Sequence, residues 1–426
     1  MDKDLIQVTR LANGLTVATD RVHGVHSAAI GVWIAAGARY EDPEREGGLA
    51  HLAEHMLFKG TPTRSAADIA HAVEAYGGDL NAYTGREVTA YHAHVLAEDA
   101  PHAADVLADM IRRSTLPEDE LAREKAVVLQ EIGMCADTPD DRVHVHAYTT
   151  AWPGQALGAP VLGTVQTVQT LTREAIMAYT HRAYRPERMV LYAAGGVKHG
   201  AVVDLAQDHF GDMQAGPALA YPAPARYAGG ELRENKALEQ AHVFLAFPGV
   251  ARDDPEYYAV QALAIVLGGG AASRLFQEIR EKRGLVYTVS AFHAAYRDTG
   301  LFGIYAGTGP ESLADLTPVA CDEVTRLADT LTEAETTRAR AQMRARLLMG
   351  REYMLHRADM GARHLLLKGQ ALDVASLVAK IEAVDAPAIA RAARRVFAGR
   401  PTLAALGPIG ALESYDALAD RLKRCT

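Results

Sequence analysis

Residues 47–58 read Gly-Gly-Leu-Ala-His-Leu-Ala-Glu-His-Met-Leu-Phe. On a helix, residues four positions apart lie on one side, so the imidazoles of His51 and His55 can reach one metal ion from successive turns. Glu54 lies on the same side, close enough to contact water at that ion. The flanking residues are strongly apolar, and polar side chains inside a buried helix need a partner that offsets their loss of water. The stretch therefore predicts a buried helix that carries a metal site.

The alternative is a solvated helix that carries two histidines and a glutamate without any function. A chain with 17 histidines can produce such a pattern. The order His-x-x-Glu-His, however, inverts the commoner zinc-peptidase motif and is the inverzincin signature. The motif and its apolar flanks together favour a metal site over the solvated helix.

A second helix is needed for the third ligand, because a catalytic zinc usually takes three protein ligands and leaves a fourth position for water. Residues 116–132 open with a proline and three acidic residues, as helices often do, and carry apolar residues at helical spacing. Glu124 and Glu131 are seven residues apart and share one face of this predicted helix. One of them can bind the metal, and the other can hydrogen-bond a metal-binding histidine.

The chain resembles the pitrilysin family of zinc peptidases, and most closely the two-domain branch that includes mitochondrial processing peptidase. In that family a ligand glutamate follows the motif at the spacing that Glu131 has here, and a supporting glutamate precedes it by seven residues, as Glu124 does. Further phrases that match the family are Leu11-Ala-Asn-Gly-Leu15, Phe58-Lys-Gly-Thr61 and Asn81-Ala-Tyr-Thr84. The resemblance implies one zinc ion per chain, held by His51, His55 and Glu131, with Glu124 in support and Glu54 as general base.

The chain also repeats itself at an offset of 212 residues. Residues 36–44 resemble residues 248–256, and residues 189–197 resemble residues 401–409. Each half passes from strand-like alternation through long helices to a short apolar strand, a pattern typical of α+β folds. We therefore predict two homologous α/β-sandwich domains, each an antiparallel-rich sheet covered by helices. The predicted parts are a metal-binding domain at 1–215, a linker at 216–230 and a homologous domain at 231–426 without metal ligands.

The duplication supplies a comparison within the chain. The positions of the second half that correspond to His51, Glu54 and His55 hold Leu263, Val266 and Leu267. Apolar residues thus serve the same helix where no metal is expected. Polar residues in the first copy are therefore better explained by chemistry than by the needs of the fold.

Four further residues enter through the resemblance. Arg280 and Tyr287 match an Arg/Tyr pair that the family uses for substrate binding and transition-state stabilisation. The alternative is a solvated helix residue and the first part of a strand. Asn81 and Ala82 fall in a segment that in the family is an edge strand and pairs with the substrate backbone, whereas an ordinary sheet strand is the alternative.

The resemblance also predicts an assembly. Single-chain relatives contain four homologous domains, so two copies of this chain would supply the same number, each copy forming half of a clamshell. Arg280 and Tyr287 of one copy would then lie beside the zinc of the other. A homodimer is favoured because the motif and the Arg/Tyr pair occur in one chain; a heterodimer with a paralogous subunit is the other possibility.

Composition limits the partners and the location. The net charge of −9 disfavours nucleic-acid binding. No apolar run is long enough to span a bilayer, and residues 1–7 resemble neither a signal peptide nor a presequence. The three cysteines, Cys135, Cys321 and Cys425, imply no disulfide framework. We therefore expect a cytoplasmic protein without nucleic-acid or membrane partners. The acidic residues Glu41, Asp42, Glu44, Glu46, Asp137, Asp140 and Asp141 are interpreted as solvated surface.

These observations predict a zinc-dependent endopeptidase that processes or degrades oligopeptides or presequence-like peptides. One alternative is a non-catalytic assembly subunit of the same fold, although such subunits have typically lost ligands that this chain retains. Another is a metal-dependent hydrolase that acts on a non-peptide bond, because the same ligands suit either reaction.

Overall fold

The computed structural model describes residues 6–216 and 220–423. Residues 1–5, residues 217–219 near the start of the predicted linker, and residues 424–426, which include Cys425, lie outside this range. The described chain forms two compact units. The first contains the segments up to Ile132, Pro160–Pro222 and Leu348–Asp373, and the second contains Gly133–Ala159, Ala223–Leu347 and the segment from Val374 onward.

The first unit contains a six-stranded sheet with the order β1-β2-β6-β3-β5-β4. Only β2 and β6 run parallel, and every other neighbouring pair is antiparallel. The strands are β1 (Gln7–Arg10), β2 (Thr16–Arg21), β3 (Ser27–Ile34), β4 (Asp79–Thr84), β5 (Thr89–Leu96) and β6 (Met189–Gly195). The strand β4 lies at one edge of the sheet, and its last residue, Thr84, contacts Glu54.

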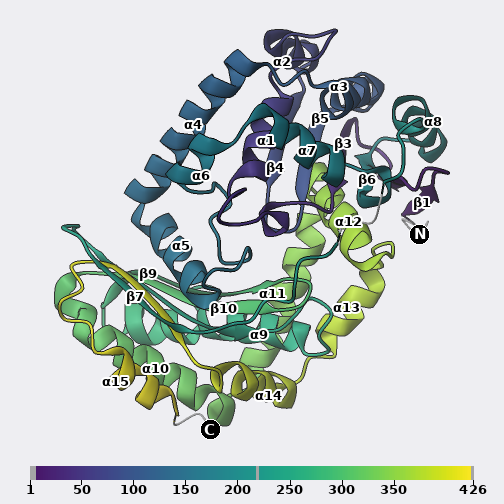
Figure 1. The fold of residues 1–426 in the computed structure, drawn as a ribbon. Coiled ribbons are helices and arrows are strands. Elements are labelled where there is room, and N and C mark those ends of the chain that lie inside the picture. The colour runs from purple at the N-terminus through teal and green to yellow at the C-terminus, as the bar shows by residue number, and fades with distance from the viewer. Residues whose placement is uncertain (1–5, 217–219, 424–426) are drawn as a thin grey trace. The chain divides into compact units, whose positions relative to one another are not determined.

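Helices cover both faces of this sheet (Figure 1). The larger apolar core lies between one face and the helices α1 (Leu49–Leu57), α2 (Ala66–Glu74), α3 (Ala100–Arg113), α4 (Glu118–Asp137), α6 (Val165–Thr170), α7 (Arg173–Ala183) and α8 (His199–Phe210). On the other face, Trp33, Ala90 and Tyr192 pack against α12 (Met354–Lys368). That helix comes from the second half of the sequence, as its yellow-green colour in Figure 1 shows.

The second unit contains a five-stranded sheet with the order β7-β11-β8-β10-β9. Its strands are β7 (Gly230–Asn235), β8 (Ala241–Gly249), β9 (Val286–Ala295), β10 (Gly300–Thr308) and β11 (Thr402–Gly407). Its helices are α5 (Pro139–Ala151), α9 (Tyr257–Gly268), α10 (Leu313–Thr330), α11 (Glu333–Gly350), α13 (Val374–Glu382), α14 (Ala386–Phe397) and α15 (Tyr415–Leu422). A short π-helix, Phe276–Glu281, precedes β9.

The two units share one topology. Each has a parallel pair formed by its first duplicated strand and its last strand, β2 with β6 and β7 with β11, followed by three antiparallel neighbours. Gly195 and Gly407, 212 residues apart, end the equivalent strands β6 and β11 with φ of 118° and 109°. The predicted α+β fold, with two homologous sandwiches whose sheets are mainly antiparallel, is confirmed.

Each unit contains one segment that comes from the other half of the sequence. In the second unit, Val143, Ala147 and Trp152 of the α5 segment cover the sheet face that carries Phe244 and Leu301. The helix α12 does the same in the first unit, and the two helices occupy equivalent places in the duplication. The domain bounds that the duplication predicts, with a linker at residues 216–230, stay a prediction. In the structure, each compact unit contains segments from both halves of the sequence.

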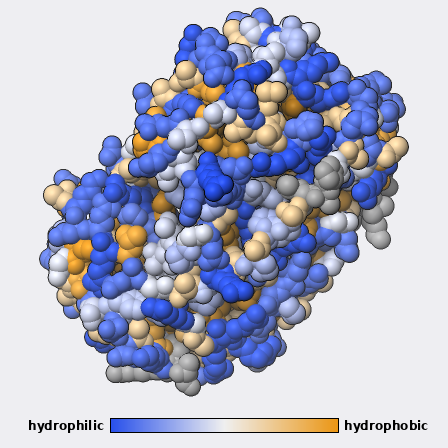
Figure 2. Space-filling model, in the orientation of Figure 1, coloured by the Kyte–Doolittle hydropathy of each residue, from blue (hydrophilic) through white to orange (hydrophobic). Residues whose placement is uncertain are grey.

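The surface carries no extended apolar band on the face drawn in Figure 2, where hydrophobic residues form small, separate groups among hydrophilic ones. Within residues 6–216 and 220–423, no helix combines the length and the apolar composition that a bilayer crossing requires.

A buried carboxylate holds the segment that follows α1. Asp109 of α3 has no exposed side-chain surface and accepts hydrogen bonds from the hydroxyls of Thr61 and Thr63 at 2.7 and 2.9 Å. It also pairs with Arg64 and Arg113, each at 2.7 Å. Burial alone would raise the pKa of Asp109, but these hydrogen bonds outweigh it and lower the pKa to about 2. The carboxylate thus fixes the connection between α1 and α2.

We expect Asp109→Asn to lower the free energy of unfolding by about 3 kcal/mol, because it leaves two arginines without their buried partner. Asp105→Asn is the matched control, since Asp105 pairs with the same Arg64 but is about one-third exposed. Its effect should stay below about 1 kcal/mol. Urea unfolding at pH 7, followed by circular dichroism, measures both. Equal losses in the two variants would contradict the role given to Asp109.

Candidate metal centre

The helix α1 begins at a glycine and a buried carboxylate. Gly48 precedes it with φ of 87°, and a side chain there would lie 2.6 Å from the carbonyl oxygen of Leu162. The carboxylate of Glu41 accepts hydrogen bonds from the backbone N–H of Gly48 at 3.0 Å and of Ala50 at 2.6 Å. These are N–H groups that a helix leaves without partners at its first turn. Glu41 therefore caps α1 from outside the helix.

The apolar face of α1 fixes its rotation. The buried residues are Leu49, Ala50, Leu52, Ala53, Met56 and Leu57. His51, Glu54 and His55 occupy the remaining side and are partly buried. On α4, Leu121 and Val128 are buried, which turns Glu124 and Glu131 toward the same region of the first unit.

The three predicted ligands, His51, His55 and Glu131, converge. One ligand atom each of His51, His55 and Glu131 lies within 4.8 Å of the others. The Oε2 atom of Glu131 is 3.7 Å from Nε2 of His51 and 3.7 Å from Nε2 of His55. Ligand atoms around a tetrahedral zinc, with bonds near 2.1 Å, lie about 3.4 Å apart. The cluster therefore has the size that one such ion requires.

The chemistry of these atoms also fits a cation. Glu131 Oε2 is buried and has no hydrogen-bond partner among the described residues, although it faces two imidazole nitrogens. Burial and the neighbouring His55 lower the pKa of His51 to about 4, so this imidazole is neutral and its lone pair is available. An unpartnered carboxylate oxygen that faces two imidazole nitrogens is the donor set that a divalent metal satisfies.

Glu124 orients one of the two histidines. The Nδ1–H of His55 donates to Glu124 Oε2 at 2.9 Å, which leaves Nε2 of the same ring for a metal. Lys59 contacts the other oxygen of Glu124 at 2.6 Å. Burial alone would raise the pKa of Glu124, but the hydrogen bonds from Lys59 and His55 outweigh it and lower the pKa. Nδ1 of His51, in contrast, is buried and has no partner in the described part of the chain.

Glu54 lies between the metal cluster and the edge strand. The hydroxyl of Thr84, the last residue of β4, donates to Glu54 Oε2 at 2.5 Å. Burial raises the pKa of Glu54 above its ordinary value, while the hydrogen bond from Thr84 and the neighbouring His55 partly oppose that rise. A carboxylate with a raised pKa beside a metal cluster is suited to accept and return a proton near neutral pH.

The structure places the other predicted site residues on two elements. Asn81 and Ala82 lie on β4, whose outer edge pairs with no other strand of the described chain, and Asn81 Oδ1 accepts a hydrogen bond from the backbone N–H of Ala82 at 2.8 Å. Arg280 and Tyr287 belong to the second unit and are exposed; Tyr287 has 78% of its surface accessible. The Arg280 guanidinium lies 4.7 Å from the ring centre of Phe276. Their placement beside a metal stays a prediction.

The sequence did not predict the roles of three residues of the centre, Glu41, Lys59 and Thr84. Glu41 was expected at the surface, and that is wrong, because 6% of its surface is exposed and it caps α1. Thr84 and Lys59 stood in phrases that match the family, but no role was assigned to either. The matching phrases were the signal for these two, whereas Glu41 stands among acidic neighbours that conceal its burial.

Comparisons with known proteins find relatives over nearly the whole chain. The family described as "Insulinase (Peptidase family M16)" matches residues 16–165, and "Peptidase M16 inactive domain" matches residues 170–343. A Rickettsia bellii protein named "Uncharacterized zinc protease" is 38% identical over 95% of this chain and 98% of its own length. An Arabidopsis thaliana protein named "Probable mitochondrial-processing peptidase subunit beta, mitochondrial" is 36% identical over 96% of this chain and 80% of its own.

A solved structure shares the fold. A protease from Helicobacter pylori matches with a TM-score of 0.89 at 21% identity, over 95% of this chain and 100% of the other. The chain thus contains two copies of one sandwich, and one copy carries a His-His-Glu cluster. This combination is that of a metallopeptidase with a duplicated domain. This chain belongs to peptidase family M16, the insulinase family, so the predicted resemblance is confirmed.

The carboxyl group of Glu41 that caps α1 should make stability depend on pH. Burial raises the pKa of Glu41 from its ordinary 4.5 to about 8, so the folded chain retains this proton where the unfolded chain has lost it. Its contribution to the free energy of unfolding therefore falls as pH rises from about 4.5 to 8, by at most about 1.4 kcal/mol per pH unit. Glu41→Gln should remove that part of the pH profile.

Urea unfolding of the metal-free protein between pH 5 and pH 8 measures the difference between the variant and the unaltered chain. Relative to the unaltered chain, Glu41→Gln should gain stability with each step up in pH. Glu44→Gln, at an exposed neighbour, should leave the profile unchanged. Parallel profiles for Glu41→Gln and the unaltered chain would show that the carboxyl titrates normally in the fold.

Proposed function

We propose that this chain is a zinc-dependent endopeptidase that cleaves oligopeptides or presequence-like peptides. The observation that carries the proposal is the convergence of His51, His55 and Glu131 with Glu54 beside them, oriented by Thr84. The names of the relatives support zinc as the cofactor, with one ion per chain. The motif order and the family support peptide-bond hydrolysis.

His51, His55 and Glu131 would hold the zinc ion, which would supply Lewis-acid activation of the scissile carbonyl and of the attacking water. Glu54 takes the proton of the attacking water and passes it to the leaving amine. Thr84 holds Oε2 of Glu54, which leaves Oε1 to carry that proton. Glu124 keeps the proton of His55 on Nδ1, so the lone pair of Nε2 would be available to hold the metal.

The edge strand β4 supports an extended peptide as the substrate. Its outer edge is unpaired within the described chain, so the backbone of a substrate strand could pair with it. Because Thr84 at the end of β4 contacts Glu54, a peptide bound along β4 would extend toward Glu54. Asn81 and Ala82 are the positions at which we place this pairing. The substrate N–H or carbonyl would then replace the contact between Asn81 Oδ1 and the Ala82 N–H.

The Arg/Tyr pair would act from a second copy of the chain. We place Arg280 on the bound peptide and Tyr287 on the developing oxyanion, both contributed by the partner of a homodimer. Their exposure in one chain supports this, because neither side chain is committed to the core of its own unit. A heterodimer with a paralogous subunit is the second arrangement, and a cytoplasmic location stays a prediction.

A non-catalytic assembly subunit of the same fold remains the competing function. Such a subunit needs neither three converging ligands nor a carboxylate with a raised pKa beside them. It would fold and assemble without stoichiometric zinc, and it would cleave no peptide in a peptide-library digest with and without chelator. The same digest separates peptide hydrolysis from hydrolysis of a non-peptide bond.

We expect Glu54→Gln to retain one zinc per chain and to lose at least about a thousandfold in kcat, because the general base is removed and no ligand changes. Metal analysis of the dialysed protein and a fluorogenic peptide assay measure the two quantities. Glu44→Gln, at an exposed position of equal charge change, is the control and should keep both. Full activity in Glu54→Gln would remove Glu54 from the mechanism.

A mixing experiment tests the shared site. Glu54→Gln and Arg280→Ala should each be nearly inactive alone. A dimer that contains one chain of each variant would have one intact site if Arg280 acts on the partner's zinc, so an equal mixture should recover about a quarter of full activity. Sites confined to single chains predict no recovery, and a stable, fully active monomer in light scattering would equally contradict the proposal.

A further inference from the structure

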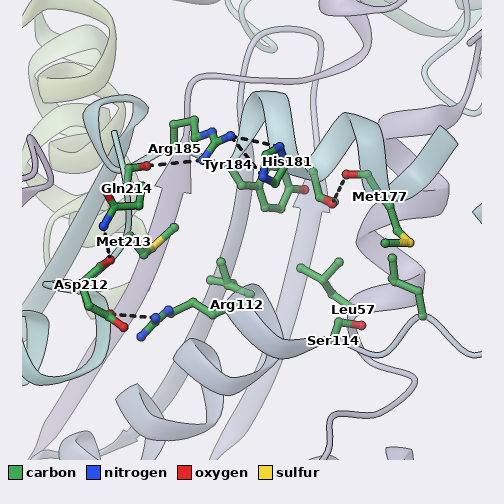
Figure 3. Close-up of a pocket in the computed structure, with 13 residues that line it drawn as sticks. Leu57, Arg112, Ser114, Met177, His181, Tyr184, Arg185, Asp212, Met213 and Gln214 are labelled. Carbon is green, nitrogen blue, oxygen red and sulfur yellow. Dashed lines mark hydrogen bonds and ion pairs between the residues drawn. The ribbon is translucent and has the colours of Figure 1, made fainter. Parts of the chain in front are cut away.

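The first unit contains a cavity of about 480 Å³ that the proposed mechanism does not use (Figure 3). This volume falls in the usual range for small-molecule sites. The cavity lies at the ends of both ligand-bearing helices. Leu57, the last residue of α1, lines it, and so does Leu116, which stands just before α4.

The backbone just before α4 is strained where it lines this cavity. Leu116 has φ of 47°, a left-handed conformation that costs a leucine about 1–2 kcal/mol. Arg173 holds the segment by donating hydrogen bonds to the carbonyl oxygens of Leu116 at 2.7 Å and Thr115 at 2.9 Å. Strained backbone persists where the surroundings impose it, and it often marks segments that move in function.

One end of the cavity is cationic. Figure 3 shows Arg112, Arg185 and Asp212 toward one end, with Leu57 and Met177 toward the other. Arg112 pairs with Asp212 at 2.7 Å. Among the described residues, Arg185 donates hydrogen bonds to the His181 ring at 3.0 Å and to the backbone oxygen of Gln214 at 3.4 Å, and it pairs with no carboxylate. Its Nε is buried and has no hydrogen-bond partner among the described residues.

The other end is apolar and is built on the core. Leu57 and Ile111 are buried, and Met177 is partly exposed at the rim. The ring of buried Tyr184 also lines the cavity, and its hydroxyl lies 2.8 Å from that of Tyr91. A hydrocarbon chain placed here would therefore touch side chains that support α1 from behind.

We propose that this cavity binds a small amphiphilic anion, a carboxylate with an unbranched hydrocarbon chain, and that its occupancy changes the affinity of the metal centre. The carboxylate accepts hydrogen bonds from the terminal nitrogens of the Arg185 guanidinium, because Nε lies against Gly216 and has almost no accessible surface. The chain lies against Leu57 and Met177. Because the occupant contacts the end of α1 and the strained residue before α4, it acts on both elements that position the metal ligands.

Decanoate, below its micelle-forming concentration, is the probe. We expect saturable binding of one decanoate per chain by calorimetry, with acetate and decanol at least about tenfold weaker because each lacks one half of the interaction. Arg185→Gln should weaken decanoate about tenfold or more. Arg182→Gln, three residues earlier on α7 and paired with Glu46 instead, should bind decanoate normally.

Met177→Glu tests the apolar end independently, since its exposed position tolerates the charge while the hydrocarbon chain does not. The coupling is read from zinc affinity, by competition with a chromophoric chelator, with and without saturating decanoate; we expect a change of at least about fivefold. Equal binding of decanol, or unaltered decanoate binding in both Arg185→Gln and Met177→Glu, would overturn the site. An unchanged zinc affinity would overturn the coupling. Neither readout depends on peptidase activity.

Discussion

The hydrogen bond between His55 and Glu124 is the contact on which the rest of the centre depends. It joins α1, which carries both histidines, to α4, which carries Glu131 two turns further on, so it sets where the third ligand arrives. Lys59 completes the link by contacting the same carboxylate from the segment after α1. The asymmetry matters, because Nδ1 of His51 has no such partner among the described residues, and its ring packs against that of His55 with 4.5 Å between the ring centres. The geometry of the cluster is therefore defined on one side by a charged network and on the other by packing.

The second unit shows what this polar arrangement replaces. Leu263, Val266 and Leu267 stand at the positions of the motif and are almost completely buried, within a helix of the same topology. In the first unit, polar residues take the place of these apolar ones. Such a cluster is stable only when its buried polar atoms have hydrogen-bond or metal partners. The edge strand β4 belongs to the same exchange, since Thr84 closes the hydrogen-bond set of Glu54.

The sequence predicted the local part of this structure well, because helical spacing alone places His51, Glu54 and His55 on one face. The choice of Glu131 over Glu124 as ligand came only from the resemblance, since both share a face and nothing in their spacing separates them. Glu41 was missed because burial depends on what packs over a residue, and an acidic run gives no sign of it. The exchange of α5 and α12 was missed for a related reason: periodicity shows that a helix buries one face but not which sheet receives it.

That exchange has a consequence for how the polypeptide is made. All six strands of the first sheet have been synthesised once residue 195 is added, but the helix that covers their second face ends only at Lys368. Trp33 and Tyr192 therefore lack the helix that covers them, α12, through most of the remaining translation. An exposed aromatic sheet face on a nascent chain invites association with other chains or with chaperones. The same dependence means that a protease cut or an early stop codon in the second half removes a wall of the first unit, so neither half of the gene encodes a self-sufficient product.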